Sequence, residues 1–271
     1  MGEVSYELII VGGGKMGSAL LGGLVDAAFA PTSAMAVIEA SPQRREELTR
    51  EFPRISVHAS LELDHVAPGT GVVLCVKPDV AEATARLAGA CGTMRLLSVV
   101  AGLSTARLEA VMPGPVAVIR SMPNTPVTVR RGASAIAGGA HVTAADLDWA
   151  EAVLGAVGVV VRLSEKHLDA VTGLSGPMPA YLFMIVEALI EAGVHQGLPR
   201  EVSETLVRAT FAGAGELLTT SPLSAEQLRH EVTSPGGTTA AGLRMLEQRA
   251  VRAAFLEAVA SAAERSRQLG R

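Results

Sequence analysis

A segment of small residues late in the chain has the composition of a loop that binds an anion. Val232-Thr-Ser-Pro-Gly-Gly-Thr-Thr-Ala-Ala-Gly242 leads into a stretch with one apolar face. Pro235 ends the preceding element, because a proline pushes the residue before it out of the helical region. Gly236 and Gly237 leave the backbone uncovered, and amides at a helix start attract anions. The segment predicts a site for a small carboxylate; a Ser-capped helix after a turn is the alternative.

A glycine-rich turn near the start of the chain is a second candidate site. It follows an apolar strand and opens a helix, with a G-x-G-x-x-G register on Gly12, Gly14 and Gly17. The first glycine permits the tight turn, the second lets a pyrophosphate approach, and the third lets helix and strand pack closely. The pattern predicts dinucleotide binding; a glycine-rich packing turn is the alternative. The candidate cofactor-binding residues are Val11, Gly12, Gly13, Gly14, Lys15, Met16 and Gly17.

The end of the second expected strand bears on the choice between NADH and NADPH. Glu39 lies where an acid can hold the ribose 2′-hydroxyl and repel a 2′-phosphate. Arg44 and Arg45 follow shortly and would favour that phosphate, unless they are solvated charges on a helix. The pattern is mixed and leans slightly to NADH.

Further candidates follow other expected strands. Ligands of open α/β sheets bind beyond the carboxyl ends of the strands, so these loops should lie at one edge. Two prolines stiffen the loop that holds Asn124, and Ala101 precedes a glycine that leaves room for a flat ring. The alternatives are that Lys77 follows its strand by chance and that the loop of Asn124 is only a rigid crossover. The additional cofactor-binding candidates are Val76, Lys77, Pro78, Ala101 and Asn124.

The elements that position these loops change character along the chain. Residues 6–162 alternate β-rich runs (6–11, 35–38, 72–76, 96–100, 116–119, 133–137 and 159–161) with helical patterns (16–28, 42–51, 79–90 and 144–156). This alternation predicts a doubly wound, mostly parallel sheet. Helical patterns alone follow, at 166–174, 179–196, 199–219, 224–231, 237–249 and 251–268. We therefore predict an α/β Rossmann domain over residues 1–163 and an all-α domain over residues 164–271.

The helices of the second half are apolar over a wide arc. A compact bundle of this size would show more polar faces. We infer that another subunit covers part of this surface; a well-buried bundle is the alternative.

Composition narrows the function classes. The 271 residues suffice for about two domains, and a net charge of −4 gives no reason to expect nucleic acid or an anionic membrane. Cys75 and Cys91 are too few for a disulfide framework, and the scattered histidines predict no metal site. The first residues do not resemble a signal peptide, and the apolar stretch Ala180–Ala192 is too short to span a bilayer. We expect a soluble cytoplasmic protein.

Several segments, in this order, resemble the pyrroline-5-carboxylate reductase family. The resemblance runs from about residue 6 to residue 268, and its last motif is the most diagnostic. It implies a Rossmann domain and a helical domain that dimerises by interlocking its helices. It also implies NADPH- or NADH-dependent reduction of 1-pyrroline-5-carboxylate to L-proline, in a homodimer or a higher ring such as a decamer. The motifs are Gly12–Gly17, Val76–Pro78, Met122–Pro126, Val171–Gly176 with Pro179–Tyr181, and Thr233–Thr239.

The resemblance also implies residue roles. Thr239 matches the family position whose hydroxyl faces the imine nitrogen, which makes it the catalytic candidate. Because a threonine hydroxyl is a weak acid, we expect it to orient the ring or relay a proton. Glu165 matches an acid that approaches the cofactor; a helix-start charge beside a capping Ser164 is the alternative. The substrate-binding candidates are Ser234, Gly236, Gly237, Thr238 and Thr239.

The chain departs from the family pattern at several positions. Pro177 and Met178 stand where the family usually has Ser-Gly, at a helix start near the expected substrate. Lys15, Ala40 and Ala59 replace a common amide, a frequent arginine and a frequent asparagine, and the missing arginine weakens the case for NADPH. Three alternatives stay open: a reductase of another cyclic imine, a β-hydroxyacid dehydrogenase, and a non-catalytic nucleotide-binding regulator.

Overall fold

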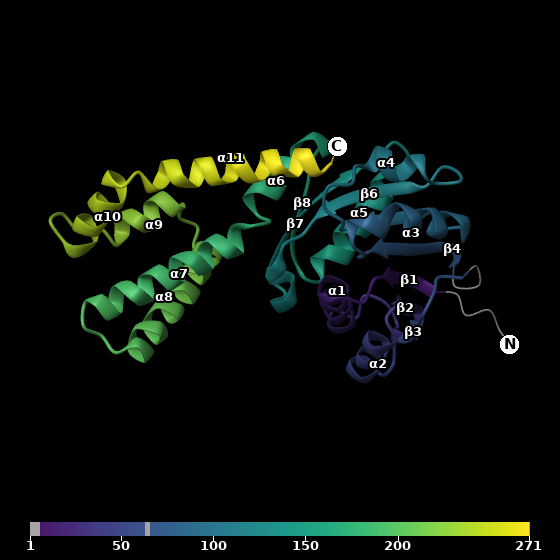
Figure 1. Ribbon diagram of the computed structural model, residues 1–271, viewed down its shortest axis with the longest axis horizontal. Coiled ribbons are helices and arrows are strands. Elements are labelled where there is room, and N and C mark those ends of the chain that lie inside the picture. Colours follow the sequence, from purple (N-terminus) through teal and green to yellow (C-terminus); the bar gives the residue numbers. More distant parts are fainter. Residues whose placement is uncertain (1–5, 63–65, 271) are drawn as a thin grey trace. The chain divides into compact units, whose positions relative to one another are not determined.

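The structure, a computed structural model, describes residues 6–62 and 66–270 (Figure 1). Its contacts divide the chain into two compact units. The first unit comprises the chain up to Pro177 together with the residues from Ser261 onward, and the second comprises Met178–Ala260. The boundary predicted at residues 163–164 falls earlier, directly after the last strand. The units divide later because the helix that follows this strand packs against the sheet through Leu168 and Val171.

The first unit is built on an eight-stranded sheet with the order β3-β2-β1-β4-β5-β6-β7-β8 in the described part of the chain. Neighbouring strands are parallel, except that β6 and β7 are antiparallel. The predicted doubly wound, mostly parallel sheet is confirmed, whereas β3 and the reversed direction of β7 were not predicted. The strands are β1 (Tyr6–Val11), β2 (Met35–Ile38), β3 (Ser56–His58), β4 (Val66–Leu74), β5 (Arg95–Ser98), β6 (Ala117–Met122), β7 (Gly132–Gly138) and β8 (Gly158–Arg162).

Two apolar clusters cover the two faces of this sheet. Alternate side chains of β1 enter different clusters, with Leu8 and Ile10 in one and Ile9 in the other. The first cluster includes side chains from α1 and α5, and the second includes side chains from α3 and α4. The helices of this unit are α1 (Lys15–Asp26), α2 (Pro42–Glu51), α3 (Pro78–Ala90), α4 (Thr105–Ala110), α5 (Ala144–Gly155) and α6 (Leu168–Leu174), with short turns η1 (Thr32–Ala34), η3 (Thr125–Val129) and η4 (Glu165–His167).

Local signals explain where α5 begins and how it joins the sheet. Thr143 and Asp146 form a capping box at its start. The Asp146 carboxylate also accepts a hydrogen bond from Arg95 Nε at 2.9 Å. Burial raises the pKa of Asp146, but the hydrogen bonds from Thr143 and Arg95 outweigh it, so the net pKa is lowered. Gly71 of β4 leaves space for the ring of Trp149, which would collide with any side chain there.

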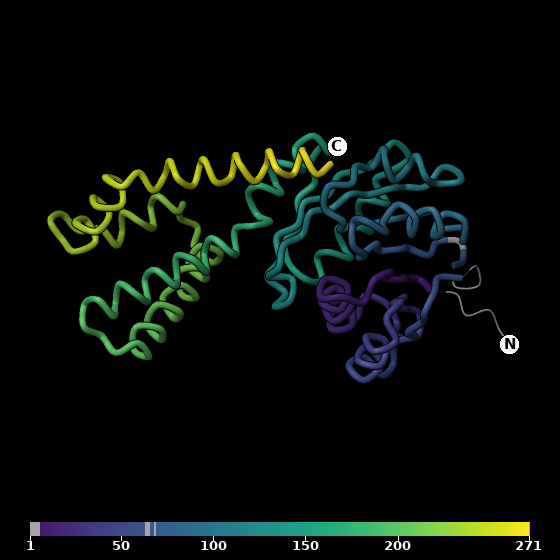
Figure 2. Tube along the Cα trace, in the orientation of Figure 1, coloured from purple at the N-terminus to yellow at the C-terminus, as the bar shows by residue number. Residues whose placement is uncertain are grey.

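The second unit consists of helices. α7 and α8 run side by side (Figure 2) and are tied by a hydrogen bond from Ser203 Oγ to the Ile190 carbonyl oxygen at 2.9 Å. Gly193 faces Ser203 and has no room for a side chain. The predicted helices are confirmed to within about two residues at each end. They are α7 (Met178–His195), α8 (Arg200–Thr220), α9 (Ala225–Glu231), α10 (Thr238–Gln248) and α11 (Val251–Leu269), whose last turns belong to the first unit.

The second unit has almost no core of its own. Pro179 and Ser203 are its two buried residues, and all residues from 178 to 260 are described. Phe183, Met184 and Leu256 are 64%, 61% and 74% exposed in the single chain. The predicted wide apolar arc is therefore confirmed, and the alternative of a self-contained buried bundle is wrong. Large apolar side chains that are exposed in such numbers indicate an interaction site.

One prediction about the apolar helices needs correction. By length and composition alone, Glu165–His195 is apolar enough to cross a membrane, with a mean hydropathy of 1.4 in its most apolar window. Only 11% of that window is buried. The stretch Ala180–Ala192, which we predicted to be too short to span a bilayer, is only the middle of α7. The apolar stretch is therefore longer than predicted. The segment carries Glu187 and Glu191 and is interrupted by a turn between α6 and α7.

Candidate functional site

The glycine loop between β1 and α1 owes its shape to two close approaches. Gly12 has a φ of +105°, and a Cβ atom there would lie 2.5 Å from the Cys75 carbonyl oxygen. A Cβ atom on Gly17 would lie 2.0 Å from the Gly12 carbonyl oxygen. At Gly14, by contrast, a Cβ atom would meet nothing within 4 Å. The turn and packing roles predicted for the first and third glycines are confirmed, and the second faces open space at a helix start that no side chain caps.

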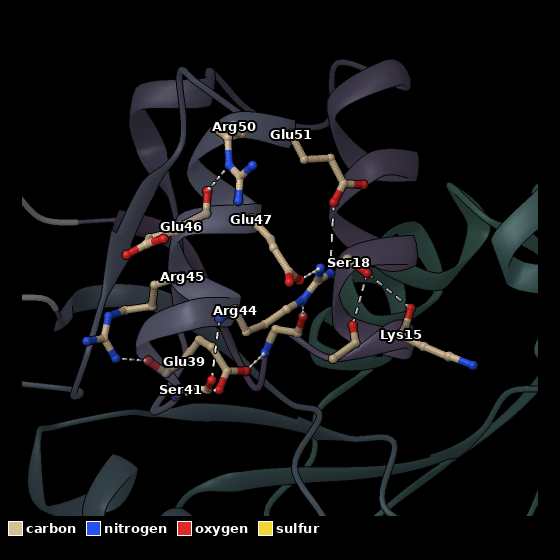
Figure 3. A network of polar contacts seen from close by, with 12 residues as sticks. Lys15, Ser18, Glu39, Ser41, Arg44, Arg45, Glu46, Glu47, Arg50 and Glu51 are labelled. Carbon is tan, nitrogen blue, oxygen red and sulfur yellow. Dashed lines mark hydrogen bonds and ion pairs between the residues drawn. The ribbon is translucent and has the colours of Figure 1, made fainter.

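The backbone of Gly13 is held by the side chains of Glu39 and Arg44, both labelled in Figure 3. Its N–H donates to Glu39 Oε2 at 2.9 Å, and its carbonyl oxygen accepts from Arg44 Nε at 2.7 Å. The other oxygen of Glu39 accepts from the Ser41 amide at 2.8 Å. Leu48 fills the space that a side chain on Gly13 would need. Sequence reasoning missed this role for Gly13, because the contacts come from the following strand and helix.

The two arginines beyond β2 are engaged within the protein. Arg44 contacts Glu47 at 2.8 Å and Glu51 at 3.8 Å through its terminal nitrogens. Arg45 donates to the carbonyl oxygens of Glu39 and Ala40 at 2.9 and 2.8 Å. Both guanidinium groups therefore serve the local structure of this unit.

A cavity of about 600 Å³ lies beyond the carboxyl ends of β1, β2 and β4. Ser60, Leu61 and Thr84 also line the cavity but were not predicted from the sequence. Ser60 and Leu61 follow β3, a strand that was not predicted, and Thr84 lies in the middle of α3. Ala59, noted only as a departure from the family pattern, is also part of the lining. The predicted cofactor-binding residues that line it are Val11, Gly12, Gly14, Glu39, Val76 and Lys77.

Near the end of β4 the cavity is lined by the thiol of Cys75 and by Lys77. Burial raises the pKa of the Cys75 thiol to about 12, so the thiol stays neutral. β4 ends at Leu74, two residues earlier than predicted, and Lys77 is the cap residue before Pro78 at the start of α3. The Lys77 side chain is exposed, and no hydrogen bond or ion pair holds it within the part of the chain that is described.

The other candidates of the glycine loop lie outside the cavity lining. Met16 packs against the apolar core. Lys15 is exposed in the first turn of α1 and lines a separate cavity of about 440 Å³, together with Phe52 and Arg130. Their predicted contacts with a cofactor remain predictions.

Two of the remaining candidates lie on loops after β5 and β6. Ala101 is exposed, and its neighbour Gly102 has a φ of +79° and packs within 3.3 Å of the Leu269 carbonyl oxygen, measured from an ideal Cβ position. Asn124 Nδ2 donates to the Ser175 carbonyl oxygen at 3.2 Å, and its Oδ1 accepts from the Ala133 amide at 2.8 Å. The Asn124 side chain thus ties three segments together, as the rigid-crossover alternative requires; the cofactor contact remains a prediction.

Glu165 belongs to a network of buried and half-buried charges. Its carboxylate accepts from the amide and the hydroxyl of Thr105, both at 2.7 Å, at the first residue of α4. Arg120, only 7% exposed, lies 3.4 Å from Glu165 and 3.6 Å from Asp169. The predicted cap by Ser164 is wrong, because its hydroxyl pairs with the His167 ring and caps no amide. Glu165 therefore fixes the loop after β5, and its approach to the cofactor remains a prediction.

The predicted substrate loop lies in the second unit, between α9 and α10. Gly236 has a φ of +70°, and the Gly237 amide donates to the Ser234 carbonyl oxygen at 3.1 Å. Thr238 and Thr239 are exposed at the first two positions of α10, and no acceptor within the described residues takes their amides. The predicted loop and helix start are confirmed. Such free amides at the start of a helix attract anions.

Two family models match this chain, one in its N-terminal part and one in its C-terminal part. Residues 165–269 match a family model described as pyrroline-5-carboxylate reductase dimerisation. Residues 7–102 match one described as NADP oxidoreductase, coenzyme F420-dependent. A pyrroline-5-carboxylate reductase from Synechocystis sp. is 40% identical, over 99% of this chain and 100% of that protein.

Solved structures give the same result. A pyrroline-5-carboxylate reductase from Coxiella burnetii has a TM-score of 0.89 and 29% identity, over 98% of this chain and 99% of that one. The pyrroline carboxylate reductase of Plasmodium falciparum, with NADP bound, has a TM-score of 0.82 and 29% identity over 100% of both chains. From its glycine loop to its last helix, this chain belongs to the pyrroline-5-carboxylate reductase family.

Proposed function

We propose that the protein reduces 1-pyrroline-5-carboxylate to L-proline with NADPH or NADH, as the last step of proline biosynthesis. The observation that carries the proposal is the start of α10, where the amides of Thr238 and Thr239 have no acceptor among the described residues. They stand in a chain that is similar along its whole length to pyrroline-5-carboxylate reductases. A helix start of this kind suits the carboxylate of the substrate.

The first unit supplies the nucleotide site. We propose that the pyrophosphate lies over the Val11–Gly17 loop, where Gly14 opens onto free space and the start of α1 is uncapped. Glu39, Val76 and Lys77 border the cavity that would take a ribose and its base, and Pro78 follows them at the start of α3. On the nicotinamide side of the site we propose Ala101, Asn124 and Glu165. Asn124 and Glu165 contribute there by shaping the loops. When bound, the reduced nicotinamide supplies the hydride.

The second unit supplies the substrate site. The amides of Thr238 and Thr239 hold the carboxylate, and Gly236 and Gly237 keep the helix start uncovered. Ser234 shapes the loop, because its carbonyl oxygen accepts the Gly237 amide. The Thr239 hydroxyl orients the ring or relays a proton to the imine nitrogen. Hydride transfer requires the nicotinamide carbon and the imine carbon to lie within about 3–3.5 Å of each other.

We also propose a cytoplasmic homodimer, with a higher ring such as a decamer as the larger assembly. The exposed apolar side chains of α7, α8 and α11 support this proposal, because a partner subunit would remove them from water. The apolar segment Glu165–His195 lies within the stretch that matches the dimerisation model. We therefore propose that a subunit covers this segment and that no membrane does.

The test is an assay of NADH and NADPH oxidation with 1-pyrroline-5-carboxylate and with 1-pyrroline-2-carboxylate, together with a 3-hydroxy acid in the reverse direction. Oxidation with 1-pyrroline-5-carboxylate supports the proposal. Activity only with 1-pyrroline-2-carboxylate would indicate a reductase of another cyclic imine, an alternative suggested by Met178 at the start of α7. Activity only with the hydroxy acid would favour a β-hydroxyacid dehydrogenase, and no activity with any substrate would favour a non-catalytic regulator.

Replacement of Thr239 tests the mechanism. Thr239→Ala should lower kcat by roughly ten- to a thousandfold, because one orienting or proton-relaying group is lost. Thr239→Ser, which keeps a hydroxyl, should recover most of the activity. Thr205→Ala, at an exposed position of α8, is the matched control and should not change kcat. Normal turnover of Thr239→Ala would remove this hydroxyl from the mechanism.

A further inference from the structure

We infer that Glu39 makes this protein prefer NADH to NADPH, and that Arg44 holds the glycine loop instead of binding a 2′-phosphate. The inference rests on the proposed function only in that a nicotinamide nucleotide binds over Val11–Gly17. Sequence alone left the choice open, because an acid and two arginines lie close together after β2. The contacts of these three side chains separate their roles.

The Glu39 carboxylate is fixed at the border of the cavity. Its two oxygens accept from the amides of Gly13 and Ser41, at 2.9 and 2.8 Å, so the carboxylate is held in place. Each carboxylate oxygen can accept more than one hydrogen bond, so both retain capacity for a ribose hydroxyl. A 2′-phosphate, with a charge of nearly −2, would instead be repelled by this carboxylate.

The Arg44 guanidinium is already held by groups of the protein itself. Its Nε donates to the Gly13 carbonyl oxygen at 2.7 Å, and its terminal nitrogens contact Glu47 and Glu51. Turning the guanidinium toward a phosphate would break the bond to Gly13 and separate the ion pairs. Glu39 therefore holds the N–H of Gly13 and Arg44 holds its carbonyl oxygen, so these two side chains (Figure 3) together clamp the Gly13 backbone.

Arg45 is not among the residues that line the cavity. It extends away from Arg44 in Figure 3, donates to the carbonyl oxygens of Glu39 and Ala40, and borders a separate groove on α2. The start of α2 offers little to a phosphate, because Glu39 takes the Ser41 amide and the Ser41 hydroxyl accepts from the Arg44 amide.

Lys77 does not offset the charge of Glu39. It is the one basic side chain among the described residues that line the cavity, and Asp79 adds a second carboxylate to the lining. Lys77 follows β4, whereas Glu39 follows β2, and β1 lies between these strands in the sheet. Lys77 and Glu39 therefore follow strands on opposite sides of β1.

The decisive experiment compares two probes that lack nicotinamide, so that binding is measured without turnover. Isothermal titration calorimetry of the full chain should give a Kd for 2′-phospho-ADP-ribose at least about tenfold weaker than for ADP-ribose. Glu39→Gln keeps the shape and one acceptor oxygen, and it should remove most of this discrimination. Glu46→Gln removes the same charge from an exposed position of α2 and should leave the ratio unchanged.

Arg44→Gln separates the two roles of an arginine at this place. Loss of a clamp on Gly13 should weaken both probes by a similar factor, whereas loss of a phosphate ligand would weaken only 2′-phospho-ADP-ribose. Four results would overturn the inference. In Arg44→Gln it is weaker binding of 2′-phospho-ADP-ribose alone, and in Glu39→Gln it is an unchanged ratio of the two Kd values. In the wild type it is tighter binding of 2′-phospho-ADP-ribose than of ADP-ribose, or binding of neither probe. Preferential binding of ADP-ribose without proline formation would sink the proposed function and leave this inference standing.

Discussion

The two compact units bury their apolar side chains in opposite ways. In the first unit, side chains such as Leu8, Ile10 and Leu97 are completely buried between the sheet and its helices. In the second, Phe183 and Leu256 are mostly exposed. The first unit therefore has an apolar core of its own, whereas we propose that another chain covers the apolar surface of the second.

This difference extends to the two sites. The glycine loop is fixed by packed backbone and by the clamp of Glu39 and Arg44 on Gly13. The loop before α10 is exposed and held mainly by its own backbone hydrogen bonds. Nucleotide binding should therefore depend little on assembly, and substrate binding should depend on it strongly. The following predictions test that contrast.

The largest effect is expected for a charge placed on the apolar surface of the second unit. Phe183→Asp should weaken the homodimer at least about a hundredfold, because burial of Phe gives about 1.5–3 kcal/mol per copy and both copies lose it. Sedimentation velocity over a range of concentrations measures this shift. Val129→Asp, at a 69% exposed apolar position of the first unit, is the control and should not change the assembly. Equal effects of both substitutions would contradict the proposed interface.

A matched pair of leucine truncations compares the cores directly. Leu97→Ala, at a site with 0% exposure, should lower the free energy of unfolding by about 2–5 kcal/mol. Leu256→Ala, at a site with 74% exposure in the single chain, should cost about 0.5 kcal/mol or less when the protein is monomeric. Denaturant unfolding at several protein concentrations makes the comparison. A large cost at Leu256 that does not vary with concentration would show that the second unit has a core of its own.

Asp146 gives the first unit a pH-dependent contribution that the second unit should lack. Asp146→Asn should cost about 0.5–2 kcal/mol at neutral pH through the capping box and the contact with Arg95. The pKa of Asp146 is lowered in the folded state, so this stability is present above about pH 4 and is lost as the pH falls through the folded-state pKa.

Unfolding of wild type and variant at neutral and acidic pH checks this prediction. The difference between them should shrink at acidic pH, and a difference that grows there would contradict the assignment. Asp148→Asn on the same helix, with its carboxylate 69% exposed, is the control and should have a smaller effect.

The smallest effect is expected for an exposed ion pair of the second unit. Glu191 pairs with Arg200 while both side chains are more than half exposed. Glu191→Gln should change the free energy of unfolding by less than about 1 kcal/mol, because solvent screens such pairs. Chemical denaturation measures this change, and a loss as large as that of Asp146→Asn would mean that assembly buries the pair.

Features with local causes could be predicted from the sequence. Gly12 and Gly17 mark a turn that only glycine can make, and the periodic apolar patterns located the helices from α7 to α11 to within about two residues. The loop of Gly236 and Gly237 before a helix is equally local. These signals follow from backbone sterics and from the period of each element, which act over a few neighbouring residues.

Tertiary structure alone decided which polar side chains remain available to a ligand. Glu165 is engaged by Thr105, and Asn124 by Ala133 and Ser175, although their residue types equally suited a cofactor site. The reversed direction of β7 and the clamp on Gly13 were also beyond local reasoning. A hydrogen-bonding group binds whichever partner the fold brings closest. That partner is often distant in sequence, so its identity cannot be deduced from the pattern around the group itself.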